Sequence, residues 1–354
     1  MREKAFDNLR VFACVLVVLV HISAQGLAVV PVGGMAFAFC QCCNILAFSG
    51  VSIFVMMSGA LALRPGRKVS VGEALRKRFL YFMFLYFLWK GLYLLFDLVR
   101  AGQLASLPAW KQLVLDEIGG RGFYHLWYLQ MIAFLSLLVP LIYEGVQRRE
   151  ACLLYLVPFM LLALLFPTMF CFEFPFKYLL MDFQGQFETE YFLGYLGYFI
   201  LGHFLYRRKG AWSAKRCGVL YAAGIAALVF GCVAGVMRSR QDGVFFKGFS
   251  SPFSITNMLC SSAIFVFFFR KEQKQADGPE KDQRFRRLTV RLCGLSLGIY
   301  LLHPFVIEVL KDCGVFFIER WTVLMVPLYA GLVFLIAAAA AFLVSRIPFI
   351  KKVV

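Results

Sequence analysis

Ten long apolar segments dominate this sequence and constrain what the chain can fold into. They occupy residues 9–30, 39–63, 79–99, 126–143, 152–170, 191–206, 217–237, 252–269, 292–313 and 322–344. A helix of about 20 apolar residues crosses the hydrocarbon core of a bilayer. A transmembrane β-barrel is excluded because its strands alternate polar and apolar residues. The sequence therefore predicts an all-α, polytopic transmembrane helical bundle of about ten spans.

The composition agrees with this fold class. Of 354 residues, 61% are hydrophobic and only 16% are charged, whereas a soluble domain carries roughly 25% charged residues. The eleven cysteines do not form two CxxC motifs, and no His/Cys cluster occurs. We therefore predict neither a metal site nor a disulfide framework. We expect a single integral membrane domain over residues 1–354, with spans from about 9 to 344 and no appended soluble domain.

The distribution of positive charge predicts the orientation in the membrane. With the N-terminus placed inside, 27 of the 37 Lys and Arg residues fall on the cytoplasmic side and 9 fall outside, while Lys90 lies within a span. Cytoplasmic loops of membrane proteins carry such an excess. We therefore expect both termini to be cytoplasmic. The rule also accounts for the net charge of +17 without a nucleic-acid partner.

The predicted helix that contains the first apolar segment carries three ionisable residues, Asp7, Arg10 and His21, on related faces. Arg10 and His21 are eleven residues apart, which brings them to within about 20° of each other around the helix axis and about 16 Å apart along it. Asp7 lies one turn before Arg10. His21 is thus placed near mid-membrane, where an ionisable side chain usually faces a polar cavity or the bundle interior. The structural alternative is a neutral His21 hydrogen-bonded between helices.

Four motifs resemble the membrane-bound acyltransferase-3 family. They are FDNLRVFACVLVVLVH at 6–21, VSIFVMMSG at 51–59, HLWYL at 125–129 and SLGIYLLH at 296–303. They occur in the order that the family shows, and the resemblance extends over residues 6 to 344. One departure is Arg76-Lys77-Arg78-Phe79, which lacks the Arg-x-x-Arg spacing and the proline of many members. A donor-binding arginine is therefore not assigned there.

The resemblance implies a function and a location. It implies an enzyme, a membrane O-acyltransferase that moves an acyl group, expected to be acetyl, from a cytosolic acyl-CoA-type thioester to a hydroxyl group. The implied acceptor is an envelope glycan, a lipid-linked sugar or a similar compound, and acyl-CoA is a donor substrate rather than a bound cofactor. The implied location is the plasma membrane of a bacterial cell, with the lipid bilayer as partner. No feature of the sequence selects the acyl group, the acceptor or the oligomeric state.

Acyl transfer needs a base near the acceptor hydroxyl and a group that binds the donor. Imidazole titrates near neutral pH, so His21 is the candidate base, and the resemblance implies the same role. Arg10 is the candidate for holding the donor, with Asp7 beside it; the structural alternative for Arg10 is an anchor to lipid headgroups.

Other segments offer further substrate-binding candidates, each with a structural alternative. His303 is a second mid-membrane histidine, and the following Pro304 frees the backbone carbonyl of Tyr300. Lys90 is costly inside a span and is therefore a site candidate. Trp127 fits either an acceptor site or the outer aromatic belt. The pair Ser58-Gly59 is interpreted as a close helix contact rather than as a catalytic serine.

A different class of function remains open at the level of sequence. A proton-coupled transporter or flippase would use mid-membrane histidines as a proton relay, although the matched, broken half-repeats common in transporters are not found. A third interpretation is a membrane sensor or assembly partner that catalyses no reaction. Cleavage of a thioester by the purified protein distinguishes the enzyme from both.

Overall fold

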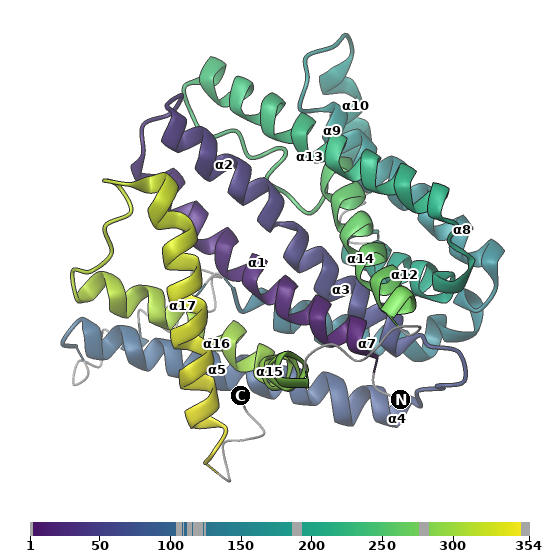
Figure 1. Ribbon diagram of the computed structural model, residues 1–354, viewed down its shortest axis with the longest axis horizontal. Helices are drawn as coiled ribbons and strands as arrows, with labels where there is room; N and C mark the ends of the chain where they lie inside the picture. Colours follow the sequence, from purple (N-terminus) through teal and green to yellow (C-terminus); the bar gives the residue numbers. More distant parts are fainter. Residues whose placement is uncertain are drawn as a thin grey trace. The chain divides into compact units, whose positions relative to one another are not determined.

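The part of the chain that the structure describes consists of helices joined by loops, without strands (Figure 1). This computed structural model describes residues 3–103, 125–185, 193–275 and 283–347, with Pro108, Trp110, Lys111, Leu115 and Phe123. The helices are α1 (Lys4–Val29), α2 (Met35–Ala47), α3 (Ser49–Ala62), α4 (Val71–Glu73), α5 (Leu80–Arg100), α7 (Trp127–Val146), α8 (Arg149–Pro158), α9 (Phe166–Met169), α10 (Lys177–Gly185), α12 (Gly194–Arg207), α13 (Ala214–Asp242), α14 (Ile255–Gln275), α15 (Gln283–Gly294), α16 (Ser296–Asp312) and α17 (Thr322–Val344). The all-α prediction is confirmed.

The number of helices long enough to span a membrane differs from the ten predicted segments. Within the described residues, seven helical stretches have the required length and apolarity, and the bent pair α15–α16 makes an eighth if it counts as one span. The segment 191–206 corresponds to the 14-residue α12, which is only about 21 Å long. The segment 252–269 corresponds to α14, whose apolar part Ile255–Arg270 is also short. Hydropathy registers apolar runs but not the points at which a helix ends or bends.

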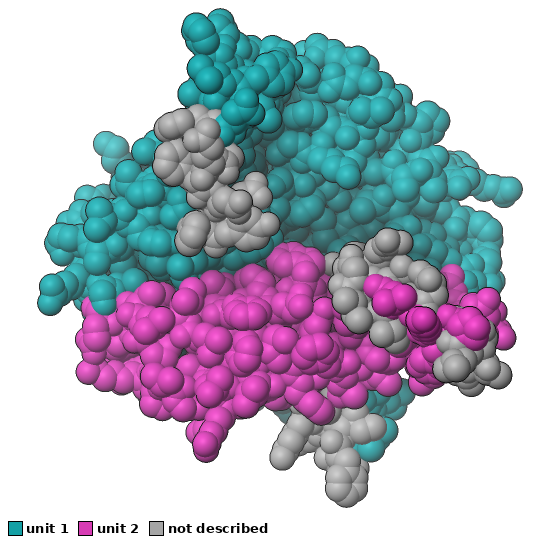
Figure 2. Space-filling model, turned by 180° about the vertical axis from the view of Figure 1, so that it is seen from behind, with its two compact units in different colours: residues 1–64, 145–352, 354 teal, residues 65–144, 353 magenta. Residues whose placement is uncertain are grey.

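The chain divides into two compact units, which Figure 2 shows in different colours. Unit 1 comprises residues Met1–Arg64 and Gly145–Lys352, and unit 2 comprises Pro65–Glu144. Unit 1 holds α1 to α3 and α8 to α17. Unit 2 holds α4, α5 and most of α7.

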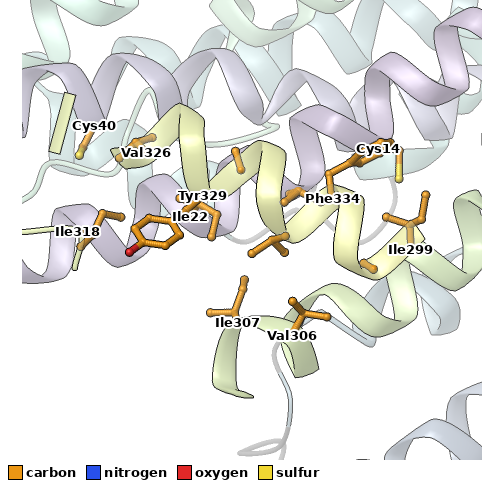
Figure 3. Packing of buried hydrophobic residues seen from close by; sticks show 14 of the residues in the cluster. Cys14, Ile22, Cys40, Ile299, Val306, Ile307, Ile318, Val326, Tyr329 and Phe334 are labelled. Carbon is orange, nitrogen blue, oxygen red and sulfur yellow. The ribbon is translucent and has the colours of Figure 1, made fainter. Parts of the chain in front are cut away.

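Helices α1, α2, α16 and α17 share one apolar cluster in unit 1 (Figure 3). Ile22 of α1, Ile299 of α16 and Phe334 of α17 are among its buried members. Lipid chains are as apolar as these residues, so close packing rather than exclusion of water must hold such helices together. The cluster fixes α16 beside α1.

Two glycines let α3 and α12 approach at backbone distance. A Cβ atom at Gly59 would overlap the backbone of Phe199, and a Cβ atom at Gly202 would overlap the backbone of Met56. The prediction of a close contact at Gly59 is confirmed. The Ser58 hydroxyl donates a hydrogen bond to the Phe54 carbonyl of its own helix, 2.9 Å away.

A buried asparagine connects α14 to the same pair of helices. The Asn257 amide donates to the Ser52 hydroxyl at 2.7 Å and to the Tyr198 hydroxyl at 3.1 Å. The Ser49 hydroxyl donates to its carbonyl oxygen at 3.3 Å. An unsatisfied amide is costly in apolar surroundings, so these bonds hold α3, α12 and α14 in one arrangement.

An acidic residue at the start of α1 joins three chain segments at one end of unit 1. Glu3 lies 2.8 Å from the Arg64 guanidinium and 2.6 Å from the Lys209 ammonium, and it accepts a hydrogen bond from the Tyr206 hydroxyl. Burial alone would raise the pKa of Glu3, but the hydrogen bonds from Lys209 and Tyr206 and the two positive charges lower it below its ordinary value of 4.5. The start of α1, the end of α3 and the end of α12 therefore meet at one end of unit 1.

We predict that Gly59→Ala destabilises the protein. The added methyl group meets the Phe199 backbone, which cannot rotate away, and overpacking of this kind costs about 1–3 kcal/mol. Thermal unfolding in detergent should show a lower Tm. The control is Gly218→Ala in α13, where nothing lies within 4 Å of the new methyl group and alanine favours the helix. Equal Tm values for both variants would contradict the close contact.

We also predict that Glu3 contributes a pH-dependent part of the stability. Because its folded pKa is lowered, the contribution is fully present above its unfolded value of 4.5 and disappears as pH falls through the folded pKa. Glu3→Gln should therefore lower the Tm at neutral pH, and the difference from wild type should shrink below about pH 4.5. A Tm difference that stays constant down to about pH 3, or that is absent at neutral pH, would refute this.

Candidate active site

Two histidines that are far apart in the sequence meet in unit 1. The rings of His21 in α1 and His303 in α16 have centroids 5.1 Å apart and planes inclined by 28°, so the imidazoles are stacked. His303 is fully buried and His21 is partly buried. The sequence singled out both residues, and the structure brings them together.

The backbone of α16 orients the His303 ring. Its Nδ1 atom lies 3.1 Å from the Ile299 carbonyl oxygen. A carbonyl only accepts, so Nδ1 carries the hydrogen in this contact and Nε2 of the neutral ring presents a lone pair. The next residue, Pro304, has no N–H for the carbonyl of Tyr300. The Tyr300 ring lies 6.2 Å from that of His303, so Tyr300 also lies at the pair.

A hydrogen-bond network on α1 and α2 flanks His21. The Asn44 amide of α2 donates to the Val20 carbonyl and to the Ser23 hydroxyl, both at 3.1 Å. The Ser23 hydroxyl donates in turn to the Val20 carbonyl. These bonds hold α1 immediately before and after His21. Sequence reasoning missed Asn44 and Ser23; the available signal was a polar amide within a strongly apolar segment.

Arg10 and Asp7 meet a thiol at the end of α15. The Cys293 thiol donates to Asp7 Oδ1 at 3.2 Å, and the Arg10 guanidinium donates to the Cys293 sulfur at 3.7 Å. Arg10 contacts Cys293 of α15, and His21 contacts His303 of α16, the helix that follows it. Cys293 was not identified as a site residue, since a cysteine beside an apolar segment resembles any other packing residue.

The helical segment opposite this face bends beside Arg10. Helices α15 and α16 meet at an angle of 68° around Leu295. Just beyond the bend, the Cys14 thiol donates to the Ser296 carbonyl at 3.8 Å. The acidic and basic groups of α1 therefore lie at the bend, whereas the histidine pair lies along α16.

Two other predicted site residues belong to unit 2 and have local contacts there. The Lys90 ammonium donates to the Tyr86 hydroxyl at 3.1 Å and lies 5.3 Å from the centre of that ring. Trp127 begins α7 beside Tyr128 and is 39% exposed, as a residue of an aromatic belt would be. The site described in unit 1 does not include them.

The arrangement in unit 1 separates two kinds of chemistry along one helix face. Imidazole nitrogens, which take and give protons near neutral pH, lie deep within α1 and α16. A guanidinium group, which binds phosphate or carboxylate, lies about 16 Å nearer the N-terminus. Such a site suits an elongated substrate with an anionic end and a reacting centre at the other end.

Comparison with known proteins identifies the family. The model of the acyltransferase-3 family, described as an acyltransferase domain, matches residues 3–346. No curated protein and no solved structure matches the chain. The family match covers both units and all motifs from which the resemblance was drawn. The chain therefore belongs to the acyltransferase-3 family of membrane acyltransferases.

Proposed function

We propose that this acyltransferase moves an acyl group, expected to be acetyl, from a cytosolic acyl-CoA-type thioester to a hydroxyl of an envelope glycan or lipid-linked sugar, with His21 as the base. The observation that carries the proposal is the stacking of His303 of α16 against His21, which lies about three turns after Arg10 on α1. An imidazole of the pair can transfer a proton, and the positive charge of Arg10 can bind an anionic part of the donor.

The proposed chemical step is direct transfer. A neutral imidazole of His21 takes the proton of the acceptor hydroxyl as the oxygen forms a bond to the thioester carbonyl carbon. The carbon–sulfur bond then breaks, and the departing thiolate receives the proton. His303 stacks on His21 and is held by the Ile299 carbonyl, so its proposed role is to orient the His21 ring.

Arg10 is proposed to hold the anionic end of the donor. The Cys293 thiol contacts the guanidinium on one side and Asp7 on the other, which fixes its direction. The separation of about 16 Å between Arg10 and His21 fits an extended pantetheine-like arm. Tyr300 is a proposed substrate contact beside the pair. Lys90 and Trp127 remain predictions for substrate contacts made by unit 2.

The proposed orientation places both termini in the cytosol, at the plasma membrane. Glu3 joins segments carrying Arg64 and Lys209, so three of the basic regions lie on one side. These are regions that the charge distribution assigns to the cytoplasmic face. A cytosolic thioester would therefore reach the Arg10 end of the site first.

Thioester cleavage tests the proposed function most simply. Purified protein supplied with acetyl-CoA and no acceptor should release free thiol slowly, because water replaces the acceptor hydroxyl. A transporter or flippase that used the histidine pair as a proton relay would release none. Absence of thiol release, both with and without membrane extract as a source of acceptor, would favour that second class of function.

We predict that His21→Ala lowers acyl transfer by about 10²–10⁴-fold, the usual effect of losing a positioned base. The rate of thiol release from acetyl-CoA provides the measurement, with membrane accumulation and Tm as tests of folding. The matched control is Ser58→Ala, because the Ser58 hydroxyl bonds its own helix and should not act as a nucleophile. Wild-type turnover in a folded His21→Ala protein would make His21 a structural residue.

We further predict that Arg10→Ala weakens donor binding more than acceptor binding. Arg10→Lys should restore the affinity only partly, because an ammonium is a point charge whereas a guanidinium makes a two-pronged contact. Calorimetry with a non-hydrolysable acetyl-CoA analogue measures the effect.

The control for this prediction is Arg240→Ala, which removes an arginine bonded to the Gly33 carbonyl at the other end of α1. Its donor affinity should equal that of wild type. If Arg10 only anchors the helix to headgroups, lysine will substitute fully and the affinity of Arg10→Ala for the donor will be unchanged.

A further inference from the structure

Helix α15 carries the most concentrated positive charge on any described helix of similar length. Its twelve residues, QRFRRLTVRLCG, include four arginines and no acidic residue. Arg284, Arg286, Arg287 and Arg291 are all exposed. The proposed active site uses only Cys293 from this helix and gives the four arginines no part in it.

The helix has two opposite faces. At about 100° per residue, Arg284, Arg287, Leu288 and Arg291 fall within an arc of about 100°. Cys293 points about 180° away from Arg284 and is buried, as is Thr289 one turn earlier. Cys293 contacts Asp7 and Arg10 of α1. The face formed by Arg284, Arg287, Leu288 and Arg291 lies on the other side of the helix, whereas Arg286, two turns before Cys293, falls on the Cys293 side.

The arginine face also contains apolar surface. Leu288 lies between the arginines and is 53% exposed. At a membrane surface, guanidinium groups lie at headgroup level, and an exposed leucine among them can contact the start of the acyl chains.

The position of α15 places it at that surface. It bends by 68° from the apolar helix α16, so it does not continue the direction of that helix. Its last turn contacts Asp7 and Arg10, which lie in the first two turns of α1. Helix α15 therefore lies on the N-terminal side of the membrane, together with Glu3 and Lys209.

We propose that the face formed by Arg284, Arg287, Leu288 and Arg291 binds the headgroups of anionic phospholipids on the N-terminal side of the membrane. Guanidinium groups bind phosphate through paired hydrogen bonds, and each basic residue near an anionic surface adds to the attraction. Zwitterionic lipids carry the same phosphate but no net negative charge, so the face distinguishes the two.

Native mass spectrometry of the full-length protein in detergent tests this surface, with dioleoylphosphatidylglycerol as the anionic probe and dioleoylphosphatidylcholine as the zwitterionic one. Wild type should bind the anionic lipid more tightly. The double variant Arg287→Gln/Arg291→Gln should lose roughly fivefold in affinity for each arginine removed, about 25-fold in total. Its affinity for the zwitterionic lipid should change far less.

The matched control is Lys215→Gln/Arg216→Gln at the start of α13. It removes two exposed charges on the same side of the membrane and should leave lipid affinity within about twofold, since those residues lie outside the proposed surface. Equal losses in the two double variants would show a general charge effect and overturn the proposal. So would an absence of preference for the anionic lipid in wild type.

A separate outcome assigns the arginines to another ligand. If Arg287→Gln/Arg291→Gln weakens binding of the acetyl-CoA analogue while its affinity for phosphatidylglycerol is unchanged, the face binds the donor and the lipid proposal is wrong. Loss of lipid affinity with donor affinity within twofold of wild type supports it.

Discussion

The structure of unit 1 depends on satisfying polar groups where no water is available. A buried amide or hydroxyl in an apolar environment is costly unless it finds a hydrogen-bond partner, and burial of apolar surface between helices gives little preference over contact with lipid. Asn257 binds α3 and α12, and Asn44 binds α1 at Val20 and Ser23. These contacts select one arrangement of helices from the many that apolar surfaces alone would permit.

The same constraint explains how the histidine pair is held. The Asn44 network holds α1 on both sides of His21, at Val20 and Ser23. His303 is oriented by the Ile299 carbonyl of its own helix. The apolar cluster of α1, α16 and α17 then holds the two helices together around the pair (Figure 3). A proton-transfer group is thereby kept in a defined direction within an apolar bundle.

The sequence predicted much of this site because helical periodicity is a local property. The spacing of Arg10 and His21 places them on one face whatever surrounds the helix. Their partners depend on tertiary packing: Cys293 lies 283 residues from Arg10, and no local pattern relates them. The count of ten spans is not confirmed for a related reason, because the ends of α12 and the bend at Leu295 are absent from an average of hydropathy.

The most direct test of the account is whether His21 and His303 work as one unit. Thiol release from acetyl-CoA should be measured for His21→Ala, His303→Ala and the double variant, each confirmed as folded by its Tm. If the stacked pair is a single proton-transfer site, each single variant is slow and the double variant is about as slow as the slower single one, because residues acting together are not additive. Losses that multiply in the double variant, or full activity in His303→Ala, would contradict a shared site.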